Sequence, residues 1–218
     1  MGKGEGAAVG EPPPYFDHGR DMDSAFLKAL AQGRPDPGGG AAAAHSAALG
    51  LALLEKVCQL EHRRRRPEGE PGFPWGDLLA RVRSVAAALL RLQAEDVKAY
   101  FQLTRARSQG GPVELAAALD EAVACPLRIM QQAQEGLALL GQGGAGCALH
   151  LVSDLLVACE LLGAAFRGAH HIARANLPLM PPDSRRAVWD EDLSHTLDAL
   201  EAEWQQARAG LLSRRPCP

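Results

Sequence analysis

Apolar residues recur along most of this chain every three or four positions, which is the spacing of helices with one buried face. The clearest stripe runs through Leu78, Val82, Val85, Leu89 and Leu92. No segment alternates between apolar and polar residues for long enough to predict a strand. The pattern therefore predicts an all-α fold, a bundle of about six helices. Their expected ranges are 21–33, 42–60, 77–108, 112–140, 147–175 and 190–212.

Glycine and proline separate the expected helices. The stretches "EHRRRRPEGEPGFPWG", "QGGP" and "NLPLMPPD" predict loops, and "GQGGAG" predicts a hinge. We expect Asp77 to cap the third helix and Pro126 to kink the fourth. Residues 1–20 are rich in Gly, Pro and charge, which predicts a flexible leader because too little apolar surface is available to order them. Residues 21–218 are expected to form one helical domain.

Composition and charge narrow the classes of partner. The 218 residues are 47% hydrophobic and carry a net charge of -3, so no basic field indicates nucleic acid or an anionic membrane surface. No uninterrupted apolar run reaches the roughly 18 residues that a membrane span requires. Five cysteines without a CxxC pair indicate a reducing compartment. The sequence predicts a cytoplasmic protein with no nucleic-acid or membrane partner.

Two aspartates occupy positions where an apolar residue is expected. Asp96 lies on the same helical stripe as Leu92 and Leu103, and the helical neighbours of Asp154 are apolar except for His150. A carboxylate removed from water is costly, and its pKa rises until it is paired, hydrogen-bonded or protonated. Both aspartates are candidates for acid/base chemistry. The alternative is that each makes a structural polar contact with a neighbouring helix or a bound water.

The stretch "DPGGGA" at 36–41 runs directly into a strong helix-forming passage. Backbone N–H groups at a helix start lack internal partners and carry the positive end of the helix dipole, and glycines let a ligand approach the backbone. The stretch is a candidate cradle for an anion or a polar ligand. It matches neither a Walker loop nor a dinucleotide fingerprint, and an ordinary interhelical loop is the alternative.

Two other polar clusters are explained without a ligand. The arginine run at 63–66 could meet an acidic ligand tail or a nucleic-acid backbone, but basic residues also complement the end of a helix dipole on a solvated surface. His170 and His171 are adjacent, so they project about 100° apart on a helix and cannot readily bind one metal ion together. No metal site is predicted.

Five motifs in order give the chain a resemblance to a known family. They are "PGGGAAAAHSAALGLALLEKV", "EDVKAY", "ACPL", "SDLLVA" and "ANLPL". Together they resemble the cyclodeaminase/cyclohydrolase family, which acts on folate-bound one-carbon units, over about residues 21–212. Members of this family are helical and commonly dimeric, and they process the 5-formimino or the 5,10-methenyl derivative of tetrahydrofolate. The resemblance therefore implies a homodimer with a tetrahydrofolate substrate and no prosthetic group.

The resemblance also assigns roles to residues. It places the catalytic aspartate at Asp96 and places around the folate the residues Gly38, Gly39, Gly40, Ala41, Tyr100, Asp154 and Asn176. Several polar positions of the family pattern are replaced, since Ala41 stands where a serine is usual and Ile172 where an asparagine is usual. The basic segment after the "EDVKAY" helix is contracted to "ARSQGGPVELAA".

Four functional hypotheses follow. The first is a methenyltetrahydrofolate cyclohydrolase, expected to be free-standing instead of bifunctional because no formiminotransferase portion is recognised in the sequence. The second is a formiminotetrahydrofolate cyclodeaminase, which releases ammonia. The third is a noncatalytic descendant that binds a folate or another protein, and the fourth is a purely structural helical dimer.

Overall fold

The computed structural model describes residues 22–64 and 72–214 and divides the chain into two compact units, Met1–Asp36 and Pro37–Pro218. In the first unit, helix α2 (Met22–Leu30) is amphipathic and ends with Lys28 in its last turn. The expected boundary between residues 20 and 21 lies outside the described residues. The division into units falls later, in the proline-rich segment after α2.

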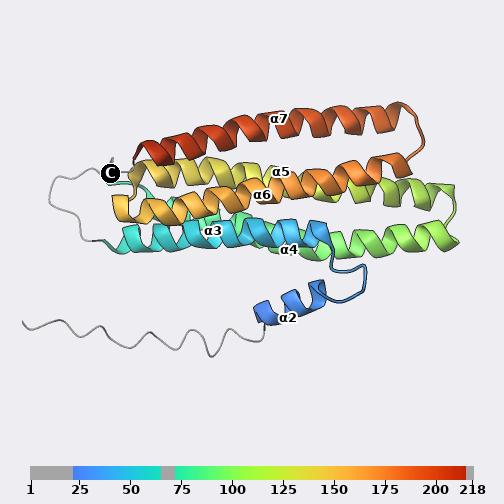
Figure 1. The fold of residues 1–218 in the computed structure, drawn as a ribbon, viewed down its shortest axis with the longest axis horizontal. Coiled ribbons are helices and arrows are strands. Elements are labelled where there is room, and N and C mark those ends of the chain that lie inside the picture. The colour runs from blue at the N-terminus through green and yellow to red at the C-terminus, as the bar shows by residue number, and fades with distance from the viewer. Residues whose placement is uncertain (1–21, 65–71, 215–218) are drawn as a thin grey trace, which may run out of the picture. The chain divides into compact units, whose positions relative to one another are not determined.

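The second unit contains five long helices, which run side by side in Figure 1. They are α3 (Gly39–Arg63), α4 (Trp75–Gln109), α5 (Pro112–Gly146), α6 (Val152–Asn176) and α7 (Ser184–Ser213). Two 3-10 turns, η1 (Leu149–Leu151) and η2 (Leu177–Leu179), flank α6. With α2 the described residues form six α-helices and no strand, which confirms the predicted all-α fold.

Four of these helices form a closed ring. Helix α3 packs against α4 and α6, and α5 packs against the same two helices from the other side. Helix α7 then covers the groove between α5 and α6. Leu51, Leu89, Ile129 and Phe166, one from each helix of the ring, are fully buried in the common core. Burial of each such side chain contributes about 1.5–3 kcal/mol to the hydrophobic stabilisation of the fold.

Several predicted helix starts were wrong by a few residues. Helix α3 begins at Gly39 instead of residue 42, so two glycines of the expected loop belong to its first turn. Helix α4 begins at Trp75, which places Asp77 in the first turn and not at the cap. Helix α7 begins at Ser184, where Asp183 caps it by accepting hydrogen bonds from two backbone N–H groups.

The predicted hinge at 141–146 was also wrong, because α5 continues through these residues to Gly146. Tertiary packing explains the helix. A Cβ at Gly143 would lie 2.9 Å from Leu54, and one at Gly144 would lie 2.7 Å from Leu211. The glycines therefore let α3 and α7 approach α5 closely, and this packing outweighs the low intrinsic helix propensity of glycine.

Two apolar segments are long enough to cross a membrane by length and composition alone, Gly39–Arg63 and Leu149–Leu179. Of their most apolar windows, 50% and 56% is buried inside the structure. Core helices of a bundle pass the same test, so this criterion is weak evidence for a membrane span.

Four free cysteines are buried in the bundle, Cys58, Cys125, Cys147 and Cys159. Burial raises the pKa of the Cys58 and Cys125 thiols to about 12 and that of Cys159 to about 11. Because the thiolate is the reactive form, we expect these thiols to react with a disulfide reagent at pH 8 only after unfolding. Thiol titration of a Cys217→Ser chain, with and without denaturant, measures this. Rapid native reaction would contradict the buried packing.

Candidate functional site

The candidate site is built around a contact between α4 and the start of α3. The backbone N–H of Ala41 donates a hydrogen bond to Asp96 Oδ2 at 2.9 Å, although the two residues are 55 positions apart. The N-cap of α3 is Gly38, which has no side chain to satisfy the first N–H groups of the helix. Asp96 therefore caps α3 from a neighbouring helix. Among the described residues, its Oδ1 atom has no hydrogen-bond partner.

Glycine is required where the carboxylate crosses the first turn of α3. A Cβ at Gly40 would lie 2.1 Å from Asp96 Oδ1 and 2.7 Å from Oδ2. A Cβ at Gly39 would lie 2.8 Å from Cδ1 of Ile172, which comes from α6. The glycines thus bring α3, α4 and α6 together, and two features predicted separately, the glycine stretch and Asp96, share one place.

Burial raises the pKa of the Asp96 carboxyl above its usual value of 3.8, and the hydrogen bond from the Ala41 N–H opposes that rise. The carboxyl group therefore holds its proton more strongly than an aspartate in water does. A carboxyl group with a raised pKa can serve as a proton acceptor and then as a proton donor in acid/base catalysis. The structure thus provides one fixed carboxylate oxygen and one available oxygen on a group suited to proton transfer.

The raised pKa of Asp96 predicts how stability depends on pH. The folded chain binds this proton more tightly than the unfolded chain, so the contribution of Asp96 is fully present below pH about 3.8 and is lost as pH rises through the folded pKa. We expect the free energy of unfolding of the wild type, relative to Asp96→Asn, to fall across that window. Urea denaturation of both proteins between pH 3.5 and 7 measures the difference. A difference that rises with pH would contradict the direction of the shift.

Two other predicted residues lie on α4 and α6, the helices that supply Asp96 and Ile172. Tyr100, one turn after Asp96 on α4, is 39% exposed and meets Phe101 edge to face with ring centroids 6.0 Å apart. Asn176, one turn after Ile172 on α6, donates from Nδ2 to the carbonyl oxygen of Ala122 at 2.7 Å. Its side chain therefore ties α6 to α5. Ala41 itself is fully buried, so it contributes its N–H and not a surface to the site.

Asp154 does not join this group within one chain. Its Oδ2 accepts a hydrogen bond from Lys56 Nζ at 2.9 Å, and its side chain is 31% exposed. Lys56 is 16 residues after Gly40 on α3, which corresponds to about 24 Å along the helix. The resemblance places Asp154 around the same folate as Asp96, but within one chain the structure does not bring the two carboxylates together. Asp154 is instead held by Lys56 of α3. The periodicity of the α6 segment could not reveal a partner that comes from another helix.

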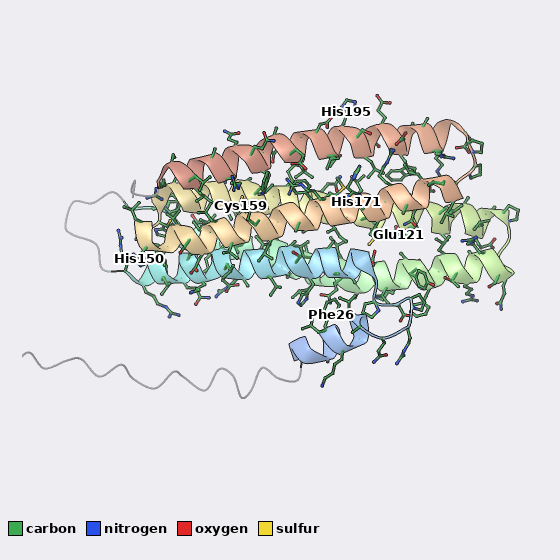
Figure 2. The ribbon with its side chains drawn as sticks, in the orientation of Figure 1. Phe26, Glu121, His150, Cys159, His171 and His195 are labelled. Atoms are coloured by element: carbon green, nitrogen blue, oxygen red, sulfur yellow. The ribbon has the colours of Figure 1, made fainter. Side chains whose placement is uncertain are left out.

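Figure 2 helps to follow this separation: His150, four residues before Asp154, lies near one end of the bundle, whereas Glu121 and His171 lie toward the other half. Asp96 is not among the residues that line two cavities of about 550 and 590 Å³. The first lies between the end of α4 and the start of α5, and the second lies between α5 and α7.

Glu95, the sequence neighbour of Asp96, belongs to an ion-pair cluster with Glu121 and Arg128. Arg128 of α5 bonds Glu121 through both terminal nitrogens, and its Nη2 lies 3.6 Å from Glu95 Oε2. Glu95 is adjacent to Asp96 in sequence but faces this ion pair instead of the glycines. Within residues 22–64 and 72–214, no three His, Cys, Asp or Glu side chains gather as a metal site.

Sequence reasoning missed one buried acid. Glu61 of α3 is 2% exposed, and its Oε1 accepts a hydrogen bond from the Ala148 N–H at 2.8 Å. It supports the turn between α5 and α6, at the end of α3 far from Asp96. Its place beside the arginine run concealed it, since a glutamate followed by arginines is typical of a solvated helix end.

Comparison with known proteins bears on this geometry. The family described as "Formiminotransferase-cyclodeaminase" matches residues 23–194 of the chain. The chain belongs to this family. The match includes the glycine stretch, Asp96, Asp154 and Asn176, so the resemblance found in the motifs is confirmed. The assigned role of each residue stays a prediction.

One curated relative is the methenyltetrahydrofolate cyclohydrolase of Methylorubrum extorquens, which is 35% identical over 83 residues. This match covers 38% of the chain and 39% of that protein, so the alignment spans well under half the length of this relative. Among solved structures, the crystal structure of formiminotetrahydrofolate cyclodeaminase from Thermotoga maritima has a TM-score of 0.77 and 21% identity. The superposition covers 88% of this chain and 93% of the Thermotoga maritima chain, which shows that the two share a fold.

Proposed function

We propose that this member of the folate one-carbon family hydrolyses 5,10-methenyltetrahydrofolate to 10-formyltetrahydrofolate, with Asp96 as the proton-handling residue. The observation that carries the proposal is the half-buried Asp96 carboxylate, held by the Ala41 N–H at one oxygen and open at the other. The partial likeness to a methenyltetrahydrofolate cyclohydrolase favours this reaction over its alternatives. The substrate is a folate, and the proposal requires no prosthetic group.

The proposed reaction uses Asp96 twice. Water attacks the one-carbon centre between the two folate nitrogens, and Asp96 accepts one proton from that water while its charge stabilises the cationic substrate. The resulting neutral adduct carries a hydroxyl group on the former methenyl carbon. Asp96 then returns its proton to N5 as the bond between carbon and N5 breaks, and the hydroxyl proton leaves as the formyl C=O forms. One water is consumed and one proton is released overall.

Cyclodeamination is the second candidate, because the family and the solved relative carry that name. In that reaction Asp96 would act as the acid that protonates the departing ammonia. Two assays distinguish the reactions: loss of the methenyl chromophore reports hydrolysis, and ammonia release from the formimino substrate reports cyclodeamination. Chromophore loss without ammonia release supports the proposal, and the reverse result replaces it with cyclodeamination.

A noncatalytic folate-binding chain is the third candidate, favoured by Ala41 and Ile172 at positions where the family pattern is polar. Calorimetric titration with folate followed by the turnover assays decides this case. Tight binding without either turnover would support it. We also propose a cytoplasmic location, since the four buried thiols are free and a reducing compartment keeps them so.

A further inference from the structure

Helix α4 carries a second apolar stripe, on the side that faces away from the core. Its first stripe points Leu89, Leu92 and Leu103 into the bundle, where all three are buried. The second stripe is displaced from the first by nearly half a turn, and its residues recur in alternating steps of three and four, which is a heptad pattern. They are Ala87, Leu90, Ala94, Val97, Phe101 and Thr104. A helix at the edge of a bundle normally carries polar residues on this side.

The second stripe is open to solvent, because α4 packs against α3 and α5 through its other sides. Leu90 is 55% exposed and Phe101 is 52% exposed, and Val97 between them is half-buried. A single exposed apolar residue is ordinary, but several on one helix face at heptad spacing form the kind of seam that packs against a second helix.

A row of cations follows one edge of this stripe. Arg91, Lys98 and Arg105 are seven residues apart, so their Cα atoms are spaced about 10.5 Å along the helix. All three are exposed, and none has an ion pair or a side-chain hydrogen bond with another described residue. Arg83, earlier on the same helix, is in contrast bonded to Glu55 at 2.8 Å. We name the second stripe and this row together the α4 outer face.

No acidic residue lies on the α4 outer face. The helix contains three acids, of which Asp77 is in its first turn. Glu95 faces Arg128 of α5, and Asp96 caps α3. Two α4 helices laid together would therefore place cations opposite cations or uncharged residues, so this face does not complement itself. Its charge fits a partner that supplies the carboxylates.

We propose that the α4 outer face docks an acidic amphipathic helix of another protein. Apolar residues of the partner pack on the seam, and its carboxylates, seven residues apart, meet Arg91, Lys98 and Arg105 in the way that flanking charges select partners in coiled coils. A contact with one helix buries less area than an interface of ordinary size, so we expect a weak, reversible complex. The α4 outer face lies on the opposite side of the helix from Asp96, and the inference does not depend on the proposed reaction.

A helix suits this face better than an anionic membrane does. Lipid-binding helices present clusters of about 4–8 basic residues, whereas the α4 outer face has a single row of three. The half-exposed carboxylates of Glu55 on α3 and Glu121 on α5 would also face the negative lipid surface near this row. The regular spacing of the cations matches the heptad of a partner helix and has no counterpart in a fluid bilayer.

Binding of a synthetic helix tests the charged part of the proposal. The probe is a fluorescently labelled peptide of about 21 residues, three heptads with leucine at both seam positions and glutamate at both flanking positions. Fluorescence anisotropy with the full chain should show binding that weakens as salt is added. Combined reversal of Arg91→Glu, Lys98→Glu and Arg105→Glu should weaken binding at least about tenfold, and each single reversal should have a smaller effect. Arg63→Glu, which changes an exposed cation at the end of α3, is the matched control and should leave binding unchanged.

A charge-swapped peptide and an apolar variant complete the test. The same peptide with lysine in place of glutamate should bind the triple reversal and not the wild type. Leu90→Ser should weaken binding of the acidic peptide, whereas Leu212→Ser, which changes an exposed leucine on α7, should not. Circular dichroism and thermal unfolding check that each variant is folded.

Four results would overturn the proposal. The wild type could fail to bind the acidic peptide, or the triple reversal could bind it as tightly as the wild type. A scrambled peptide of the same composition could bind equally well, which would remove the heptad from the recognition. Finally, phosphatidylcholine/phosphatidylserine vesicles could bind the wild type and not the triple reversal, or sedimentation could show self-association that the triple reversal abolishes. Either finding would assign the α4 outer face to a membrane or to a second copy of the chain.

Discussion

Asp96→Asn should lower turnover of the methenyl substrate on the order of 10²–10⁴-fold, because an amide cannot accept the proton that the reaction must transfer. The variant should nevertheless fold, since asparagine retains an oxygen that can accept the Ala41 hydrogen bond and asparagine is among the best helix caps. Chromophore loss measures turnover, and thermal unfolding measures stability.

Two further variants separate catalysis from structure. Asp96→Ala removes the cap as well as the acid and should cost about 1 kcal/mol of stability in addition to the lost turnover. Glu95→Gln is the matched control, since it removes the neighbouring carboxylate, which faces Arg128 and not the glycines. It should keep turnover near the wild-type value. Turnover that survives in Asp96→Asn, or that falls equally in Glu95→Gln, would remove Asp96 from the proposed role.

Gly40→Ala should both destabilise the protein and abolish the site geometry. The new Cβ would lie 2.1 Å from Asp96 Oδ1, a distance at which either the carboxylate or the first turn of α3 must move. Overpacking of a fixed site costs about 1–3 kcal/mol, and turnover should fall with the displaced carboxylate. Urea denaturation and the chromophore assay measure the two effects.

Gly141→Ala, in α5, should stabilise the protein, in contrast to Gly40→Ala. A Cβ at this position meets no described atom within 4 Å, so the substitution should stabilise α5 by up to about 1 kcal/mol, the difference in helix propensity. The pair of variants thus separates a glycine required for close approach from one that is not. If Gly40→Ala proved as stable and active as the wild type, the close contact between α3 and Asp96 would be wrong.

The sequence predicted the parts of this molecule that depend on local pattern. The stripe from Leu78 to Leu92 is buried as expected, and Asp96, which periodicity places on the same stripe, is half-buried. The glycine run at 141–146 was misread, because its helix depends on contacts with Leu54 and Leu211 that are remote in sequence. Local composition indicates a hinge, and only the packed helices override it.

The candidate site shows the same division between local and remote information. Motif resemblance joined the glycines to Asp96, and the 2.9 Å contact between Ala41 and Asp96 supports that prediction. The partner of Asp154 was not predictable, since Lys56 is 98 residues away and belongs to another helix. A carboxylate on an apolar stripe can be buried or can reach a cation across a helix boundary, and the stripe alone does not distinguish the two.

The cap that Asp96 provides to α3 has a consequence for judging relatives of this chain. A carboxylate that also closes a helix end is held in place by folding as well as by chemistry. A descendant that had lost its enzymatic role would still be selected for an acceptor at this position, and asparagine or serine would satisfy that need. Replacement of the acid by such a neutral acceptor, with the glycines kept, would therefore mark scaffolds that persist after the reaction has been abandoned.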